Sequence, residues 1–187
     1  TSSALGLTQS VGKSGTFGLS LMFMQLGDFH ETTADQPDGT GVTFSPSYFN
    51  LGFAYSQRFS ESIKGGILVR LVNQSVRNAK ASGVAFDAGI QYQPVDFKKF
   101  RFGVSLRNVG SSMQFTGDGL SGKGSFNTGN QYTQTLVQRT ARFEMPTTLY
   151  IGASYDLYET EDDKHLLTGM ATFNSHSYTK DRFLVGF

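Results

Sequence analysis

The chain has 187 residues with a net charge of +1, and its composition excludes several protein classes. Without a basic run, this charge argues against nucleic-acid binding. The absence of cysteine excludes disulfide scaffolds, thiolate metal sites and cysteine nucleophiles. No apolar run reaches the ~18 residues of a transmembrane helix. The length fits a single domain over residues 1–187.

Apolar residues alternate with small or polar residues along most of the chain. In residues 101–108, for example, Phe102, Val104 and Leu106 share one face, and the residues beside them are Arg, Gly and Ser. Strict alternation predicts β-strands with one apolar face. Most of these strands have the ~9–11 residues that a tilted strand needs to cross a bilayer. Nine strands are predicted, over residues 4–11, 15–27, 47–59, 63–73, 82–93, 100–108, 147–157, 164–174 and 181–187.

Short and long connections alternate between the predicted strands. The long loops are 28–46 and 109–146, 74–81 is longer than its neighbours, and 175–180 is intermediate. The short turns are 12–14, 60–62, 94–99 and 158–163. Outer-membrane barrels have short periplasmic turns and longer outside loops. The pattern therefore favours an all-β fold, an antiparallel transmembrane β-barrel with both long loops outside. A soluble β-sandwich, whose apolar face lies inside, shows the same alternation and stays an alternative.

The strand count suggests a larger protein. Bacterial single-chain barrels have an even number of strands, whereas nine are predicted here. We therefore expect that an N-terminal strand is missing and that the chain is part of a larger barrel.

Charged side chains on the small, polar face of the predicted strands are candidate lumen residues. Facing lipid, each would cost a few kcal/mol near the bilayer midplane, so we expect them to point into the lumen. There they would brace the lumen by pairing across strands, or line a path or bind a polar ligand. The six candidates are Lys64, Arg70, Asp87, Arg101, Arg107 and Asp156.

The loop 109–146 is rich in Gly, Ser, Asn, Gln and Thr. A structureless loop longer than ~15 residues is usually functional or disordered. Aromatic residues among small polar ones suit an adaptable protein-binding surface. Phe115, Phe126, Tyr132 and Leu136 are therefore predicted to contact a partner. A lumen plug and a disordered segment are the alternatives.

No pattern points to catalysis, a cofactor or a metal. The histidines His30, His165 and His176 lie in or beside predicted loops without a triad arrangement. The acidic loop around Asp28 and Asp38 lacks the spacing of a calcium loop. No P-loop or dinucleotide fingerprint is present. We therefore expect a non-enzymatic protein without cofactor or metal.

Five sequence blocks are similar, in order and spacing, to the PorV/PorQ family of outer-membrane β-barrels. That family is related in fold to the long-chain fatty-acid (FadL-type) transporter barrels, with about 14 strands. The resemblance implies a further strand before this chain and roughly four after it, so that the chain is truncated at both ends. A barrel-terminal aromatic at Phe187 is the alternative. The blocks are GTFGLSLMFMQLGDFHETT (15–33), FSPSYFNLGFAYSQRFSESIKGGILVRLVNQS (44–75), GVAFDAGIQYQ (83–93), FRFGVSLRNVGSSMQF (100–115) and MPTTLYIGASYDL (145–157).

The resemblance implies a bacterial outer-membrane subunit of the type IX protein secretion system. Its partners would be a large translocon barrel, secreted proteins with C-terminal signal domains, and the membrane's lipids and lipopolysaccharide. Such a subunit acts as a cargo shuttle that passes exported proteins to a surface attachment complex. Two alternatives remain. One is a FadL-like channel for hydrophobic small molecules, which Met22, Met24 and Leu68 on the inner face allow weakly. The other is a soluble β-sandwich binding module.

Overall fold

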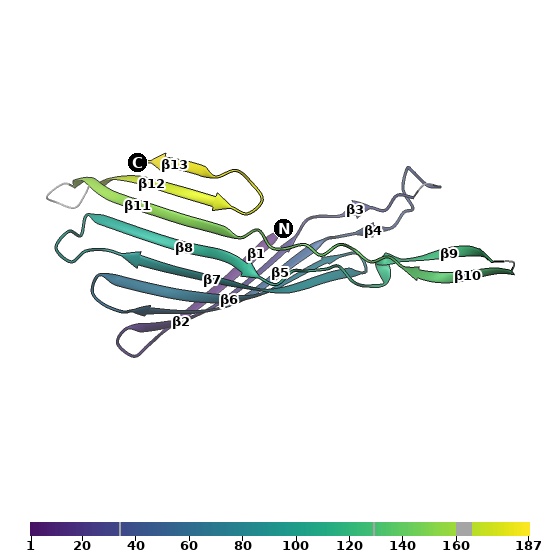
Figure 1. Ribbon diagram of the computed structural model, residues 1–187, viewed down its shortest axis with the longest axis horizontal. Helices are drawn as coiled ribbons and strands as arrows, with labels where there is room; N and C mark the ends of the chain where they lie inside the picture. The colour runs from purple at the N-terminus through teal and green to yellow at the C-terminus, as the bar shows by residue number, and fades with distance from the viewer. Residues whose placement is uncertain (34, 129, 160–165) are drawn as a thin grey trace.

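The chain forms one antiparallel sheet of nine strands with two short two-stranded ribbons attached (Figure 1). The computed structural model describes residues 1–33, 35–128, 130–159 and 166–187, and for residues 123–128, 130–134 and 159 it describes the backbone alone. Helical structure in the described part is one 3-10 turn, η1 (Asp118–Leu120). No helix in these residues is long and apolar enough to cross a membrane.

All nine predicted strands are confirmed, with ends that differ by no more than three residues. Each strand pairs with the next one along the sheet in an up-and-down antiparallel order, including across the two long connections between β2 and β5 and between β8 and β11. The strands are β1 (Ser2–Val11), β2 (Gly15–Gln25), β5 (Ser47–Arg58), β6 (Ile63–Val76), β7 (Ala79–Tyr92), β8 (Phe100–Gly110), β11 (Thr148–Glu159), β12 (Leu166–His176) and β13 (Arg182–Gly186).

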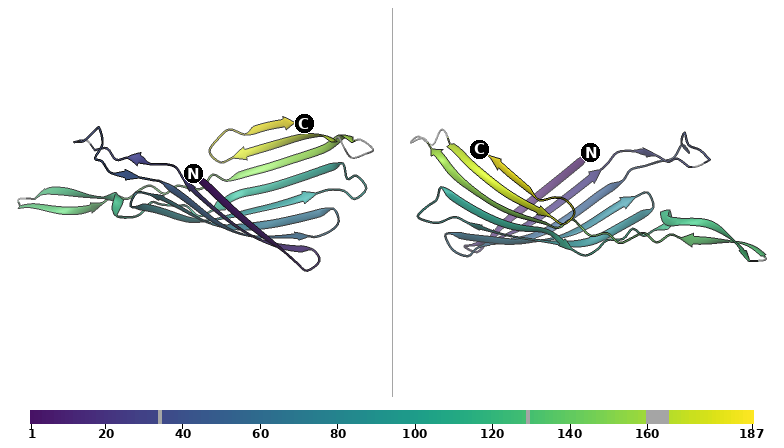
Figure 2. Two further views of the ribbon diagram at one scale, coloured as in Figure 1. Left: turned by 180° about the vertical axis from the view of Figure 1, so that it is seen from behind. Right: turned by 45° about the horizontal axis from the view of Figure 1, so that its top comes forward.

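The sheet is open. β1 pairs with β2 and β13 with β12, and no ladder joins β1 to β13 in the described chain. The sheet is twisted and curved, so that both edge strands rise from a trough whose floor is the middle strands (Figure 2). The described residues therefore form an open sheet with two strand edges, and the larger barrel expected from the sequence stays a prediction.

Strand register divides the side chains between two faces. We call the face with the alternating apolar residues the apolar face and the opposite one the polar face. Large apolar side chains are exposed on the apolar face: Leu5, Leu7, Phe17, Leu19, Leu21, Phe53, Ile67, Leu71, Phe86, Ile90 and Leu106. The buried strand residues lie on the polar face: Val72, Ala79, Ala81, Ala85, Asp87, Thr148, Asp156 and Asn174. Curvature crowds side chains on a concave surface, so the polar face is the inside of the trough.

The predicted longer connection at 74–81 is wrong. β6 and β7 continue to Val76 and from Ala79, which leaves a two-residue turn at 77–78. Arg77 takes a left-handed conformation there, with φ of 52°, as tight hairpin turns require. This extension could not be predicted from alternation, because the apolar-face positions of both strands are occupied there by the polar residues Asn73, Ser75 and Ser82.

Both long loops contain strands, so the structureless loop predicted at 109–146 is wrong. β3 (Phe29–His30) pairs with β4 (Thr43–Phe44), and β9 (Ser121–Thr128) forms a hairpin with β10 (Asn130–Val137). Both ribbons lie at the same end of the sheet, and the β9–β10 hairpin extends well beyond it (Figures 1 and 2). Alternation did not predict this hairpin because most of its residues are Gly, Ser, Thr, Asn and Gln, and Phe126, Tyr132 and Leu136 are too widely spaced along the chain to give an apolar period of two.

The main apolar cluster lies on the polar face at the base of this hairpin. Met113 is fully buried against Val72 and Ala81, with Phe115 and Phe143 packed beside them. Paired backbone hydrogen bonds join Met113 to Phe143, at 2.7 and 2.9 Å. Gly83 makes room for this packing, since a Cβ there would lie 2.7 Å from the Met113 Cγ. The cluster therefore anchors the hairpin base to the sheet.

Replacing Met113→Ala is expected to lower the free energy of unfolding by about 2–4 kcal/mol, because it leaves a cavity in this cluster. The matched control is Met170→Ala, at a half-exposed side chain of the same face, with an expected loss below about 1 kcal/mol. Urea titrations of the purified chain measure both losses. Equal losses would contradict the anchoring role of Met113.

Candidate functional site on the polar face

The six predicted lumen residues all lie on the polar face. Register places them there through the pairs of β5 with β6, β6 with β7, β8 with β11 and β11 with β12. The structure brings Arg70, Asp87 and Arg107 into one group and Arg101 and Asp156 into another. Lys64 is exposed and belongs to neither group. The prediction that they share one face is confirmed by the register. That this face lines the lumen of a barrel stays a prediction.

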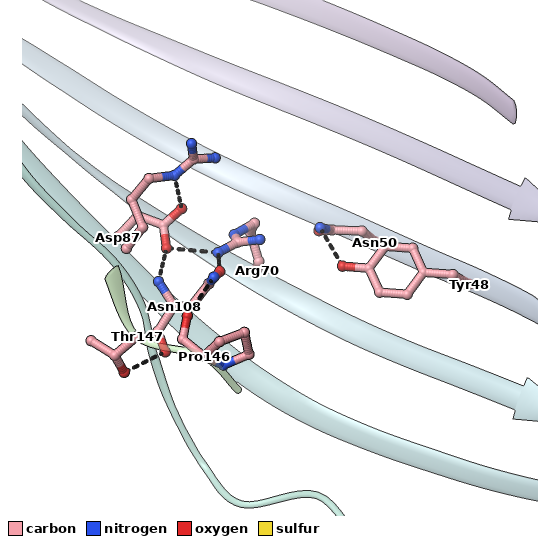
Figure 3. A network of polar contacts seen from close by, with 8 residues as sticks. Tyr48, Asn50, Arg70, Asp87, Asn108, Pro146 and Thr147 are labelled. Carbon is pink, nitrogen blue, oxygen red and sulfur yellow. Dashed lines mark hydrogen bonds and ion pairs between the residues drawn. The ribbon is translucent and has the colours of Figure 1, made fainter. Parts of the chain in front are cut away.

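The first group centres on the Asp87 carboxylate (Figure 3). Its Oδ1 accepts hydrogen bonds from Arg70 Nη2 and from the Asn108 backbone N–H, both at 2.7 Å. Arg107 Nε lies 3.9 Å from the other oxygen, Oδ2. The side chains of Arg70 and Asp87 are only 13% and 10% exposed. Each of these two buried charges therefore depends on the other for compensation.

A β-bulge creates this geometry. The register between β7 and β8 shifts at Asp87, so that Arg107 and Asn108 together oppose this one residue. Asn108 adopts φ of 61°, a left-handed conformation that Asn tolerates better than most residues. The bulge thereby allows the Asn108 N–H to reach the carboxylate. Asn108 is not among the residues predicted from the sequence for this face. Its signal is the pair of consecutive polar residues at 107–108, which interrupts an alternating run.

Asn108 also ties the returning end of the long loop to the sheet. Its Nδ2 donates to the Pro146 carbonyl at 2.9 Å, and the Thr147 hydroxyl donates to the Asn108 carbonyl at 3.2 Å. Its Oδ1 accepts a further hydrogen bond from Arg70. The group therefore connects β6, β7, β8 and the segment that leads into β11.

The second group lies nearer the opposite end of the strands. Arg101 Nη2 lies 2.5 Å from Asp156 Oδ2, and the Thr168 hydroxyl donates to Asp156 Oδ1 at 2.8 Å. The Asp156 side chain is buried, whereas that of Arg101 is partly exposed. This group connects β8, β11 and β12.

An open hollow of about 720 Å³ lies on the polar face beside the second group. Its floor contains glycines that pair across strands, Gly66 with Gly89 and Gly103 with Gly152. Lys64 and Arg101 both line it, and no carboxylate among the described residues does. The other polar lining residues are Ser56, Gln91, Ser105, Tyr150, Ser154 and Thr172. The hollow therefore offers positive charge and hydroxyl groups.

The predicted partner-binding residues of the long loop are not equivalent. Phe115 is half-buried and stacks on Phe143, with ring centroids 5.6 Å apart, so it belongs to the hairpin base. Leu136 is exposed on β10. The side chains of Phe126 and Tyr132 lie outside the described residues, as does His165.

No family model matches the chain, and no curated protein or solved structure matches it. The resemblance to the PorV/PorQ family therefore stays a prediction.

Replacing Asp87→Asn is expected to lower the free energy of unfolding by about 3 kcal/mol or more, because Arg70 is then buried without a counter-charge. The double variant Arg70→Met/Asp87→Asn is expected to be more stable than Asp87→Asn, since no charge is left uncompensated and the amide still accepts from Asn108. The control Lys64→Gln removes an exposed charge and is expected to change stability by no more than about 0.5 kcal/mol. Urea titrations compare the three. A loss in Asp87→Asn no larger than in Lys64→Gln would show that the pair contributes nothing.

Proposed function

We propose that the sheet is part of the wall of a β-barrel in the bacterial outer membrane. The observation that carries this proposal is the uncovered apolar face: Phe53, Ile67 and Phe86 are more than half exposed near the middle of their strands. No second sheet covers this face within the described residues. Contact with lipid would bury these side chains, whereas water would leave a large apolar surface exposed. A hollow on this face, lined mainly by apolar residues of β1, β2, β5 and β6, would be filled by acyl chains.

The extent of the apolar face supports a membrane-spanning role. On β6 it runs from Ile63 to Leu71, and on β7 from Val84 to Tyr92, in register. Eight residue steps cover about 27 Å along a strand, close to the ~25 Å apolar band of outer-membrane barrels. Beyond it, both strands become polar together: Asn73 opposes Ser82, and Ser75 opposes Lys80. One boundary of the band would therefore lie between Leu71 and Asn73.

Aromatic residues gather at the opposite boundary. Tyr92 opposes Phe102 across β7 and β8, and Phe97 packs on Tyr155 with ring centroids 5.6 Å apart. Phe59, in the β5–β6 turn, is exposed. Outer-membrane barrels carry aromatic girdles at the membrane–water interfaces. This arrangement supports placing the short turns at the periplasmic interface and both ribbons outside.

Within this barrel, we assign the chain the role of a subunit of the type IX secretion machinery. The outside ribbons would hold the C-terminal signal domain of an exported protein, and the wall would dock against the translocon barrel. Two observations support this role: the resemblance of five sequence blocks to the PorV/PorQ family, and the β9–β10 hairpin, which projects beyond the sheet on an anchored base.

The alternatives receive less support. A soluble β-sandwich would bury the apolar face against a second sheet, and the described residues contain no such sheet. A channel for hydrophobic molecules needs an apolar pocket in the lumen, whereas the hollow on the polar face places two cations, Lys64 and Arg101, among its apolar and hydroxyl-bearing lining residues.

The membrane proposal predicts that charge is tolerated on one part of β6 and not on another. Ile67→Arg, at the middle of the apolar face, is expected to reduce the free energy of folding into phospholipid vesicles by about 2–4 kcal/mol. Ser75→Arg, on the same strand and face but beyond the band, is expected to cost less than about 1 kcal/mol. Equal effects would contradict the proposal, because in water both positions are surface sites. A chain that stays soluble without detergent would contradict it as well.

The secretion role predicts which proteins accompany the chain in a detergent pull-down of the native protein from outer membranes. Mass spectrometry is expected to detect a very large barrel and exported proteins that share a C-terminal domain. Replacing residues 121–137 by a short Gly/Ser linker is expected to remove the exported proteins. The linker is feasible because Leu120 and Gln138 already lie side by side, joined by a 2.9 Å backbone hydrogen bond.

The control for this experiment replaces the connection 177–181, at the same end of the sheet, by an equal linker. It is expected to retain the exported proteins. Recovery of the chain alone, with bound fatty acid, would instead favour the transport channel.

A further inference from the structure

The polar face is strongly positive although the whole chain is nearly neutral. The nine strands direct six cations and three carboxylates to this face, an excess of three positive charges, whereas the net charge of the chain is +1. The cations are Arg58, Lys64, Arg70, Arg101, Arg107 and Arg182, and the carboxylates are Asp87, Asp156 and Glu159. Asp87 and Asp156 are already engaged by arginines.

The excess charge includes an unfavourable pair. Arg58 and Lys64 lie directly opposite each other on β5 and β6. Like charges in this position destabilise a sheet. Neither side chain forms an ion pair with a residue that the structure describes. An anion placed between or beside them would remove this repulsion.

The hollow on the polar face provides the space for such an anion. Lys64 contributes three N–H donors to its wall. Arg101 also lines it and uses Nη2 to bind Asp156, so most of its five N–H donors are left for a ligand. Hydroxyl groups from Ser56, Ser105 and Ser154 add neutral donors. The paired glycines leave the floor free of side chains, so a ligand can lie close to the backbone.

We propose that this hollow, between Lys64 and Arg101, binds a small soluble anion that carries phosphate or carboxylate groups. Charge-assisted hydrogen bonds to Lys64 and Arg101 supply the affinity, and the serine hydroxyls orient the ligand. No carboxylate in the described part of the chain lines the hollow, and the two cations select against a positively charged ligand. The site goes beyond the proposed secretion role and does not depend on it, because its binding is measurable in detergent solution without membrane or partner.

The test is isothermal titration calorimetry of the full chain in detergent with two probes, inorganic pyrophosphate and citrate. An ionic strength of about 0.15 M suppresses non-specific attraction between distant charges. At least one probe is expected to bind. Lys64→Gln is expected to weaken that binding about tenfold or more through loss of a charge-assisted hydrogen bond, and Lys64→Arg to preserve most of it.

The matched control is Lys180→Gln, which removes the same charge from an exposed position in the β12–β13 connection, away from the hollow. Its binding is expected to equal that of the unaltered chain. Lys64 is exposed and has no ion-pair partner among the described residues, so its variants are expected to fold normally, which urea titration checks. Binding of neither probe would overturn the proposal, as would equal weakening by Lys64→Gln and Lys180→Gln.

Discussion

A single sheet has no interior, and this constraint governs the rest of the molecule. Every strand side chain faces one side or the other, and no second layer covers either side in the described chain. Apolar side chains that share a face therefore need an apolar environment, which a bilayer supplies. Charged side chains that share the concave face must neutralise one another or stay in water. Arg70 and Asp87 neutralise each other, whereas Lys64 stays exposed to water.

The bulge at Asp87 joins several strands through buried contacts, as a packed core does in a two-layered protein. It directs a backbone N–H and two arginines to one buried carboxylate, and through Asn108 it holds the segment before β11. Apolar packing is concentrated elsewhere, around Met113 at the hairpin base. Polar contacts thus brace the middle of the trough, whereas apolar contacts fix its ribbon-bearing end.

An element of this fold could be predicted from the sequence where its apolar and polar residues alternate, and not where they do not. The nine strands were predictable because one face of each is apolar, which gives a period of two. The β9–β10 hairpin was not, because most of its residues are small and polar and its few apolar residues are widely spaced. The six charged residues could be assigned to a face by alternation alone. Their pairing could not, because the contacts of Asp87 depend on a register shift and on the backbone of Asn108. Arg58 was overlooked because it ends its strand beside a turn, where its opposition to Lys64 becomes visible only in the register.

The open sheet also limits how a barrel can close around it. Strands alternate in direction from β1 to β13, and nine is an odd number, so both edge strands point the same way. Two copies related by rotation about the barrel axis would set β13 of one beside β1 of the other in parallel, which breaks the antiparallel pattern. A closed antiparallel barrel therefore takes an odd number of additional strands. The direction of the two edges thus excludes closure of this sheet by one copy of itself in the same orientation.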